Sequence, residues 1–279
     1  MERLSVLPVS FFPDFAVGRM TIVDWARIAK GIGLAYVDLP NWAFRCHQPV
    51  YLGRLKTELD ILGISIAMVG TYSDFTNPDA LQRRRELDYL RRDIALASQM
   101  GARLLRVTDG QAHPGTCLEQ GINWAVEGLT EAAATAVDYG MQLVFENHGQ
   151  PGGWVYDDFS HNVEVFLEIA MRLDGTGIGI NFDNGNATGC GWDAVELLKR
   201  VLGNVVSVHI SDTGSRATTL HTALGAGASP IRGVLELLKS SGFDGWICIE
   251  EDSGRGVDGI YQAVTQVRGI WNSLPEWKG

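Results

Sequence analysis

The sequence predicts an α/β protein of the (β/α)₈ TIM-barrel class, built as one domain over residues 1–279. Two observations predict this class. Short runs rich in Val, Ile and Leu alternate eight times with stretches of helical periodicity, and Gly, Pro, Asn or Asp separates them. No linker, low-complexity tract or block of like charge interrupts the alternation. A doubly wound open sheet is the alternative arrangement of the same units.

The predicted strands are short apolar runs bounded by turn-forming residues. Their length of five to seven residues is typical of strands in globular proteins. They are Leu4–Val9, Ala35–Leu39, Ser65–Val69, Leu104–Thr108, Leu143–His148, Gly177–Asp183, Val205–Ser211 and Trp246–Glu251.

The predicted helices fill the gaps between these strands, and their apolar residues recur at intervals of three and four. Several of them end near a glycine, the residue that commonly stops a helix. The clearest apolar stripes are Ile22, Trp25, Ala26 and Ala29 before Gly31; Leu87, Leu90, Ile94 and Ala97; Val195, Leu197, Leu198 and Val201 before Gly203; and Val234, Leu235, Leu237 and Leu238 before Gly242.

The composition is that of an ordinary globular protein, with 46% hydrophobic and 20% charged residues. The 23 Lys and Arg residues against 33 Asp and Glu give a formal net charge of −10, which repels nucleic acid and anionic membrane surfaces. The first residues lack the basic and apolar regions of a signal peptide, and no apolar run has the length of a membrane span. We therefore expect neither nucleic acid nor a membrane as a partner.

The cysteines indicate the redox environment. Cys46, Cys117, Cys190 and Cys248 are scattered without a C-x-x-C pair. This spacing favours neither a zinc ribbon nor a disulfide framework. It suits a reducing compartment, so we expect a cytoplasmic protein.

Four of the predicted strands end in residues that bind metals well. In a (β/α)₈ barrel the active site lies at the C-terminal ends of the strands. There the sequence has Glu146 in LVFENHG, Asp183 in IGINFDNGN, His209 in VVSVHISD and Glu250 in WICIEED. We therefore take these four residues as candidate metal ligands.

The alternation of side chains along a strand tests this grouping. Side chains on the same face as a ligand are two residues away from it. That face carries mostly small or polar residues, namely Val144, His148, Asn181, Ser207, Ser211 and Cys248. The opposite face carries Leu143, Phe145, Ile178, Ile180, Phe182, Val206, Val208, Ile210, Ile247 and Ile249, which suits packing against outer helices. The four ligands are thus predicted to point into one barrel mouth.

Three carboxylates in a partly desolvated pocket repel each other unless a cation neutralises them. Oxygen ligands with one imidazole nitrogen favour Mn²⁺ or Mg²⁺, and they also tolerate Co²⁺ or Zn²⁺. The sequence therefore predicts one divalent metal ion, with Mn²⁺ preferred. The alternative is that each group separately caps a loop or pairs with an arginine.

On these motifs, together with LGAGASPIRGVLELLKSSGFDG, the chain resembles the xylose isomerase-like TIM barrels of the sugar phosphate isomerase/epimerase family, which includes D-tagatose 3-epimerases and hydroxypyruvate isomerases. The resemblance covers essentially the whole chain. It implies that Glu146, Asp183, His209 and Glu250 hold one divalent metal. It also implies that Glu146 and Glu250 are catalytic and move protons on either side of a ketose through an enediolate. A small sugar substrate and a homo-oligomer, a dimer or tetramer, are expected from the same resemblance.

Two residues depart from the epimerase pattern. Epimerases of this family usually carry a histidine where this chain has Asn186, so Asn186 is a candidate substrate-binding residue. His148 follows Glu146 by two residues, a spacing similar to that of the metal-dependent keto-polyol dehydratases of inosose or 3-dehydroshikimate type. His148 is thus either a substrate-binding residue of an isomerase or a catalytic group of a dehydratase. A non-catalytic sugar-binding or partner subunit is the third alternative.

Residues in the loops are weaker candidates for substrate binding. Arg216 follows the seventh predicted strand, where family members often place a substrate-binding arginine. Trp42 follows the second predicted strand, where an indole face could contact a sugar. Apurinic endonucleases share the fold, but the sequence lacks the additional histidines of their metal cluster after the third and fourth strands.

Overall fold

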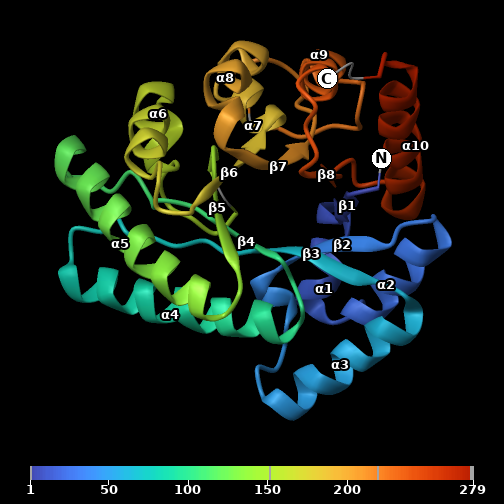
Figure 1. Cartoon of the computed structure of the whole chain (residues 1–279), viewed down its shortest axis with the longest axis horizontal. Coiled ribbons are helices and arrows are strands. Elements are labelled where there is room, and N and C mark those ends of the chain that lie inside the picture. The colour runs from blue at the N-terminus through green and yellow to red at the C-terminus, as the bar shows by residue number, and fades with distance from the viewer. Residues whose placement is uncertain (1, 151, 219, 277–279) are drawn as a thin grey trace.

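Eight parallel strands form a nearly closed barrel in the computed structural model, which describes residues 2–150, 152–218 and 220–276 (Figure 1). Ladders pair the strands in the order β1-β8-β7-β6-β5-β4-β3-β2, and contacts between β1 and β2 complete the ring. The strands are β1 Leu4–Leu7, β2 Tyr36–Pro40, β3 Ser65–Gly70, β4 Leu104–Val107, β5 Gln142–Glu146, β6 Gly179–Asp183, β7 Val205–Ile210 and β8 Trp246–Glu250.

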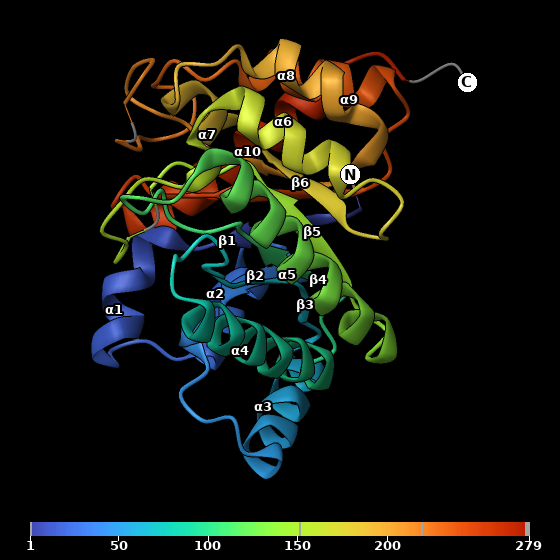
Figure 2. The same ribbon diagram turned by 90° about the vertical axis from the view of Figure 1, so that its left-hand side faces the viewer.

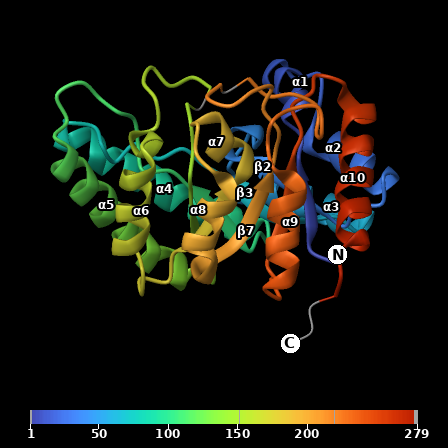
Figure 3. The same ribbon diagram turned by 90° about the horizontal axis from the view of Figure 1, so that it is seen from above.

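Helices follow the strands and surround the barrel (Figures 1 and 2). They are α1 Phe12–Val17, α2 Ile22–Gly31, α3 Pro49–Leu62, α4 Ala80–Gln99, α5 Leu118–Asp138, α6 Val163–Arg172, α7 Asn184–Gly189, α8 Ala194–Val201, α9 Ile231–Ser240 and α10 Gly256–Ser273. The loops after β4, β5 and β7 gather at one end of the barrel, in green, yellow and orange in Figure 3. None of the helices in the described ranges is long and apolar enough to span a bilayer.

The predicted barrel and all eight predicted strands are confirmed, with shifts at the strand ends. β1 ends at Leu7 because Pro8 follows it and a 3-10 turn, Val9–Phe11, begins the next segment. β5 ends at Glu146, so His148 lies in the following loop and not on the strand. β6 begins at Gly179 because Gly177 adopts a left-handed backbone with φ +85°.

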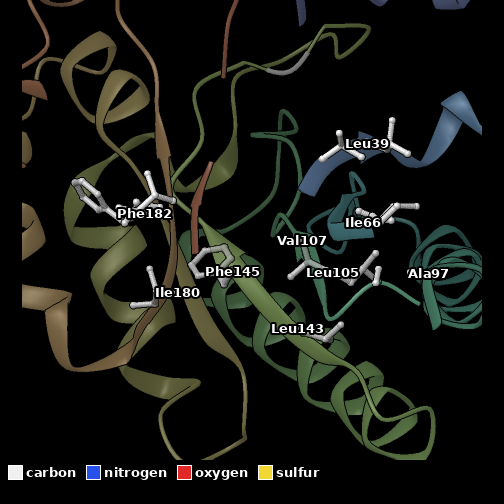
Figure 4. Close-up of a cluster of buried hydrophobic side chains, with 14 of the residues drawn as sticks. Leu39, Ile66, Ala97, Leu105, Val107, Leu143, Phe145, Ile180 and Phe182 are labelled. Atoms are coloured by element: carbon white, nitrogen blue, oxygen red, sulfur yellow. The ribbon is translucent and has the colours of Figure 1, made fainter. Parts of the chain in front are cut away.

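The core has two parts, which the barrel wall separates. The outer part packs one face of the strands against the helices, and Figure 4 shows members from neighbouring strands, including Leu105, Leu143, Phe145, Ile180 and Phe182. The inner part is a small group of apolar side chains at the N-terminal end of the barrel interior, Ala67, Met68, Leu104, Val144 and Trp246. The polar strand ends therefore lie above an apolar floor.

One residue contradicts the predicted alternation. Val206 was expected on the outer face with Val208, but it packs against the inner group. The register between β6 and β7 shifts at Ile180 and Asn181, so that Val205 pairs with Ile180 and Ser207 with Asn181. This irregularity turns Val206 inward while Ser207 keeps the face of His209.

Two carboxyls meet under the loops at the C-terminal end of the barrel. Asp109 follows β4, Asp158 follows β5, and both are fully buried. Burial raises the pKa of Asp109 to about 6. Burial and the charge of Asp109 raise the pKa of Asp158 well above its usual range. The pair therefore holds protons in the folded state at pH values where an unfolded chain has released them.

We expect the contribution of this pair to the stability to fall as the pH rises from about 4 through 6, because the two carboxyls bind more protons in the folded state than in the unfolded state in this range. Asp109→Asn removes the repulsion and can still accept the backbone N–H of Gly110. Its free energy of unfolding at pH 8 should exceed that of the wild type by about 1–2 kcal/mol, with a smaller difference at pH 4. Urea unfolding at both pH values measures this.

The matched control is Asp244→Asn, since the side chain of Asp244 is 96% exposed. Its stability should follow that of the wild type at both pH values. An equal difference in the free energy of unfolding between Asp109→Asn and the wild type at both pH values would contradict the claim that this pair holds protons in the folded state.

Candidate metal centre

Four side chains from β5, β6, β7 and β8 converge at the C-terminal end of the barrel. One ligand atom from each of Glu146, Asp183, His209 and Glu250 lies within 4.8 Å of the others. His209 Nδ1 lies 2.8 Å from Glu146 Oε1, 3.0 Å from Glu250 Oε2 and 3.7 Å from Asp183 Oδ2. The structure thus brings together the four residues that the sequence selected.

Asp183 is held by its position at the start of a helix. Its Oδ1 caps α7 by accepting the backbone N–H of Asn186 at 2.7 Å, and it also accepts the Ser211 hydroxyl at 2.9 Å. Its Oδ2 is buried, faces His209 and makes no hydrogen bond in the described part of the chain. One oxygen therefore fixes the carboxylate while the other remains available to a ligand.

Two asparagine side chains continue the strand pairing beyond the ladders. Asn147 donates to the carbonyl of Asp183 at 2.8 Å and accepts its N–H at 2.9 Å. Asn184 makes the same pair of bonds with the backbone of Ser211, both at 3.1 Å. These amides tie the end of β5 to β6 and the end of β6 to β7, which fixes the distances between the ligands they flank.

Glu146 is held by groups of opposite charge and by an amide. Arg106 of β4, also buried, places its Nε 3.2 Å from Glu146 Oε2. Asn181 donates to Glu146 Oε1 at 2.5 Å and accepts the Ser207 hydroxyl at 2.6 Å. The Arg106 guanidinium fits because Gly70 faces it, where a Cβ would come within 2.9 Å of Nη2.

The electrostatics of the cluster fit a divalent cation. Three carboxylates carry three negative charges, Arg106 offsets one of them, and a divalent ion would offset the other two. Burial and the charges of Glu250 and Glu146 raise the pKa of Asp183 to about 7. Burial by itself lowers the pKa of His209, but the Glu146 carboxylate outweighs it and raises the pKa well above its usual range. Protons on Asp183 and His209 thus reduce the negative charge of the cluster, as a cation would. Because these protons compete with a metal ion for the same groups, metal binding should strengthen as the pH rises.

The donor set selects the class of ion. Carboxylate oxygens with one imidazole nitrogen suit Mn²⁺, Mg²⁺, Co²⁺ or Zn²⁺, and the cluster contains no thiolate. The unpaired, buried Asp183 Oδ2 indicates a missing partner of positive charge. The residues present therefore fit a divalent metal ion.

His148 and two aromatic rings line the mouth beside the cluster. His148 Nε2 lies 3.8 Å from Glu146 Oε2. The ring of Tyr72 stands edge-on to His148 with centroids 5.8 Å apart, and Trp154 follows at 6.2 Å from Tyr72. Arg106 lies over the Tyr72 ring at 4.2 Å. These contacts form a wall of rings next to Glu146.

Of the other candidate substrate-binding residues, only Asn186 contacts a ligand in the described part of the chain, and it does so through its backbone. Asn186 is in α7 and contacts Asp183 through its backbone N–H. Trp42, 42% exposed, packs edge-on against Phe12 with centroids 4.9 Å apart. Arg216 is exposed in the loop after β7 and donates to the backbone oxygen of Trp192 at 3.4 Å. No contact within the described ranges joins Trp42 or Arg216 to the four ligands.

Arg106 and Tyr72 are two residues of the site that were not predicted from the sequence. Arg106 had a visible signal, since it is the one charged residue in the predicted strand Leu104–Thr108 and lies on the face of Leu104. No sequence pattern marked Tyr72 as a site residue. It lies in the loop after β3, and the path of that loop depends on the folded structure.

We expect Asn147→Ala to lower the free energy of unfolding by about 1–3 kcal/mol, because it leaves two backbone groups of Asp183 without partners. Chemical denaturation measures the loss. Asn186→Ala is the control, since the bond of Asn186 to Asp183 uses its backbone, and it should change stability by less than about 0.5 kcal/mol. Equal effects of the two substitutions would contradict the role given to Asn147.

Comparison with known proteins identifies the family of the fold. The family model described as xylose isomerase-like TIM barrel matches residues 26–269. An uncharacterized protein of Methanocaldococcus jannaschii is 29% identical over 257 residues, covering 86% of this chain and 84% of that protein. The inosose dehydratase of Geobacillus thermodenitrificans is 20% identical over 242 residues, covering 77% of this chain and 78% of the dehydratase.

Solved structures share the fold at low identity. The crystal structure of a D-tagatose 3-epimerase-like protein superposes with a TM-score of 0.79 at 19% identity, covering 97% of this chain and 98% of that one. The crystal structure of the IOLI protein with a bound zinc atom superposes with a TM-score of 0.80 at 16% identity, covering 98% of this chain and 99% of that one.

Proposed function

The chain belongs to the xylose isomerase-like TIM barrel family, and from that premise we propose that it is a divalent-metal-dependent isomerase or epimerase of a ketose or a related sugar. The observation that carries the proposal is the convergence of Glu146, Asp183, His209 and Glu250 at the C-terminal end of the barrel. A metal centre at this end of the fold lies where such barrels bind their substrates.

The four converging residues would hold the ion, with Mn²⁺ as the preferred metal and Mg²⁺, Co²⁺ or Zn²⁺ as alternatives. A divalent ion held there would polarise a ketone and its neighbouring hydroxyl, and it would thereby make the adjacent C–H acidic. The chain's own residues then have to remove the proton and return it.

The two glutamates divide this task. The side chain of Glu250 is 18% exposed and that of Glu146 is 1% exposed, so one faces the mouth and the other is enclosed. One carboxylate takes the proton from carbon. A carboxyl group returns a proton either to the neighbouring carbon, while the hydroxyl proton passes from one oxygen to the other, or to the opposite face of the same carbon. The first outcome is isomerisation and the second is epimerisation. Arg106 and Asn181 keep Glu146 in one orientation during the transfer.

A second candidate function is dehydration of a keto-polyol, and the position of His148 favours it. Burial lowers the pKa of His148 to about 4, so the imidazole is neutral near pH 7 and can accept a proton. Its Nε2 is 3.8 Å from Glu146 Oε2, within reach of a substrate that contacts both residues. The inosose dehydratase relative supports the same chemistry. In this reaction a base removes a proton from one carbon, the hydroxyl of the neighbouring carbon takes up a proton and leaves as water, and a double bond forms between the two carbons.

We expect the purified protein to bind one divalent ion per chain, because the three carboxylates need a counter-charge. His209→Ala and Asp183→Asn should each weaken binding more than about tenfold. His148→Ala is the control, since this residue lies beside the ligands without belonging to them, and it should retain the ion. Elemental analysis after dialysis with and without chelator measures the content. An unchanged melting temperature after chelation, with no metal found, would end the proposal.

Proton exchange tests the chemistry and separates the candidates. The Mn²⁺-loaded protein, incubated in D₂O with a panel of ketoses and keto-polyols, should incorporate deuterium beside the carbonyl. Glu146→Gln and Glu250→Gln should each slow this exchange by about 10²-fold or more.

In an isomerase, His148→Gln mainly raises KM while exchange persists. In a dehydratase, the same substitution abolishes a product with a conjugated double bond that absorbs in the ultraviolet. A sugar that binds without exchange or elimination would indicate a non-catalytic subunit.

A further inference from the structure

Below the metal centre lies a group of buried polar side chains that the proposed chemistry does not use. It consists of Ser5 of β1, Asp38 of β2 and Cys248 of β8, all 2% exposed or less. Cys248 precedes Glu250 by two residues and pairs in register with His209. Side chains two apart on a strand share a face, so this group forms the layer directly beneath Glu250 inside the barrel.

Asp38 has polar atoms without partners. Neither of its carboxyl oxygens makes a hydrogen bond in the described residues, and the Ser5 hydroxyl makes none either. A charged or polar group buried without partners is strongly disfavoured, so such a group indicates an interaction that the fold is built to make. We therefore expect a hydrogen-bond donor close to the Asp38 carboxyl.

The far side of the His209 ring offers such a donor. His209 Nδ1 faces Glu146 and Glu250 at 2.8 and 3.0 Å, whereas Nε2 points the opposite way and lies 4.0 Å from Asp38 Oδ2. Nε2 is buried and likewise makes no hydrogen bond in the described part of the chain. A movement of about 1 Å brings the two atoms to hydrogen-bond distance.

We propose that Asp38 is the positioning residue of His209: its carboxyl accepts the Nε2–H hydrogen bond, orients the ring and leaves Nδ1 to bind the divalent ion. This inference rests on the metal centre of the proposed function. A metal-binding histidine generally donates its second ring N–H to such an acceptor, which fixes the tautomer. The Cys248 thiol is a weaker acceptor than a carboxyl oxygen, and it donates to the backbone oxygen of Ile249 at 3.7 Å.

The same atoms suggest one rival arrangement. Ligand atoms of Asp38, His209 and Cys248 lie within 4.8 Å of one another, which is also the spacing of a metal site. In that arrangement Nε2 would itself be a ligand and would carry no proton. The two arrangements thus differ in the Nε2–H proton and in the number of ions bound.

The test uses the full chain with Zn²⁺ as the probe, because Zn²⁺ is diamagnetic. Affinity is measured by competition with a chromogenic chelator. Asp38→Leu should weaken Zn²⁺ binding about 10–100-fold, whereas Asp38→Asn, which keeps an acceptor oxygen, should recover most of that loss. Cys248→Ala is the matched control from the same layer, and it should stay within about threefold of the wild type.

Nuclear magnetic resonance observes the Nε2–H proton of His209 directly. This signal would not change if Asp38 only stabilised the fold. In Zn²⁺-loaded protein with ¹⁵N-labelled histidine, His209 should show a protonated, slowly exchanging Nε2 and an unprotonated Nδ1. The Nε2–H signal should persist in Asp38→Asn and exchange rapidly in Asp38→Leu. If Asp38→Leu does not fold, the wild type and Asp38→Asn decide the question, because an Nε2 without a proton in the Zn²⁺-loaded wild type overturns the proposal.

The outcomes separate this inference from the proposed function. A wild type that binds no Zn²⁺ overturns the metal centre and the role of Asp38 together. A wild type that binds Zn²⁺, with Asp38→Leu unchanged in affinity and in the His209 signals, overturns only the role of Asp38. Two Zn²⁺ ions per chain, one of them lost in Cys248→Ala, overturn it as well, because Asp38 would then be a ligand.

Discussion

The mutual repulsion of Glu146, Asp183 and Glu250 inside the barrel must be offset by groups that the strands bring to the same place. Arg106 of β4 supplies one positive charge, and His209 of β7 supplies another when its ring is protonated and no ion is bound. Hydrogen bonds from Asn181 and Ser211 hold two of the carboxylates from the sides. Most of the polar interior of the barrel can be understood as a response to this one concentration of negative charge.

The barrel interior is divided into an apolar part and a polar part, and the apolar part stabilises the fold against the cost of burying the charged cluster. Apolar side chains fill the N-terminal end, and the outer face of every strand packs against helices. The metal-ligand cluster lies at the C-terminal end, where the amides of Asn147 and Asn184 replace missing ladder bonds. The apolar parts stabilise the fold, and the polar end is free to hold charged groups in a rigid arrangement.

The two glutamates differ in surroundings although they occupy equivalent strand ends. Arg106 and Asn181 fix the enclosed Glu146, whereas Glu250 is partly exposed at the mouth. His148 adds a neutral imidazole on the Glu146 side. Different environments for paired acid–base groups are how one site assigns them different tasks. The asymmetry is compatible with proton return at a second position and with elimination assisted by His148.

The sequence by itself determined the eight strand and helix units and the four residues at the strand ends, because alternation along a strand is local and every side chain has only two faces to choose from. Only the tertiary structure decided which side chains contact one another across the barrel. Arg106, Tyr72 and Asp38 gain their meaning from residues far away in the chain, and Val206 changed face through a register shift that depends on its neighbouring strand. A local pattern states which face a residue occupies, whereas contacts across the barrel depend on how all strands are staggered.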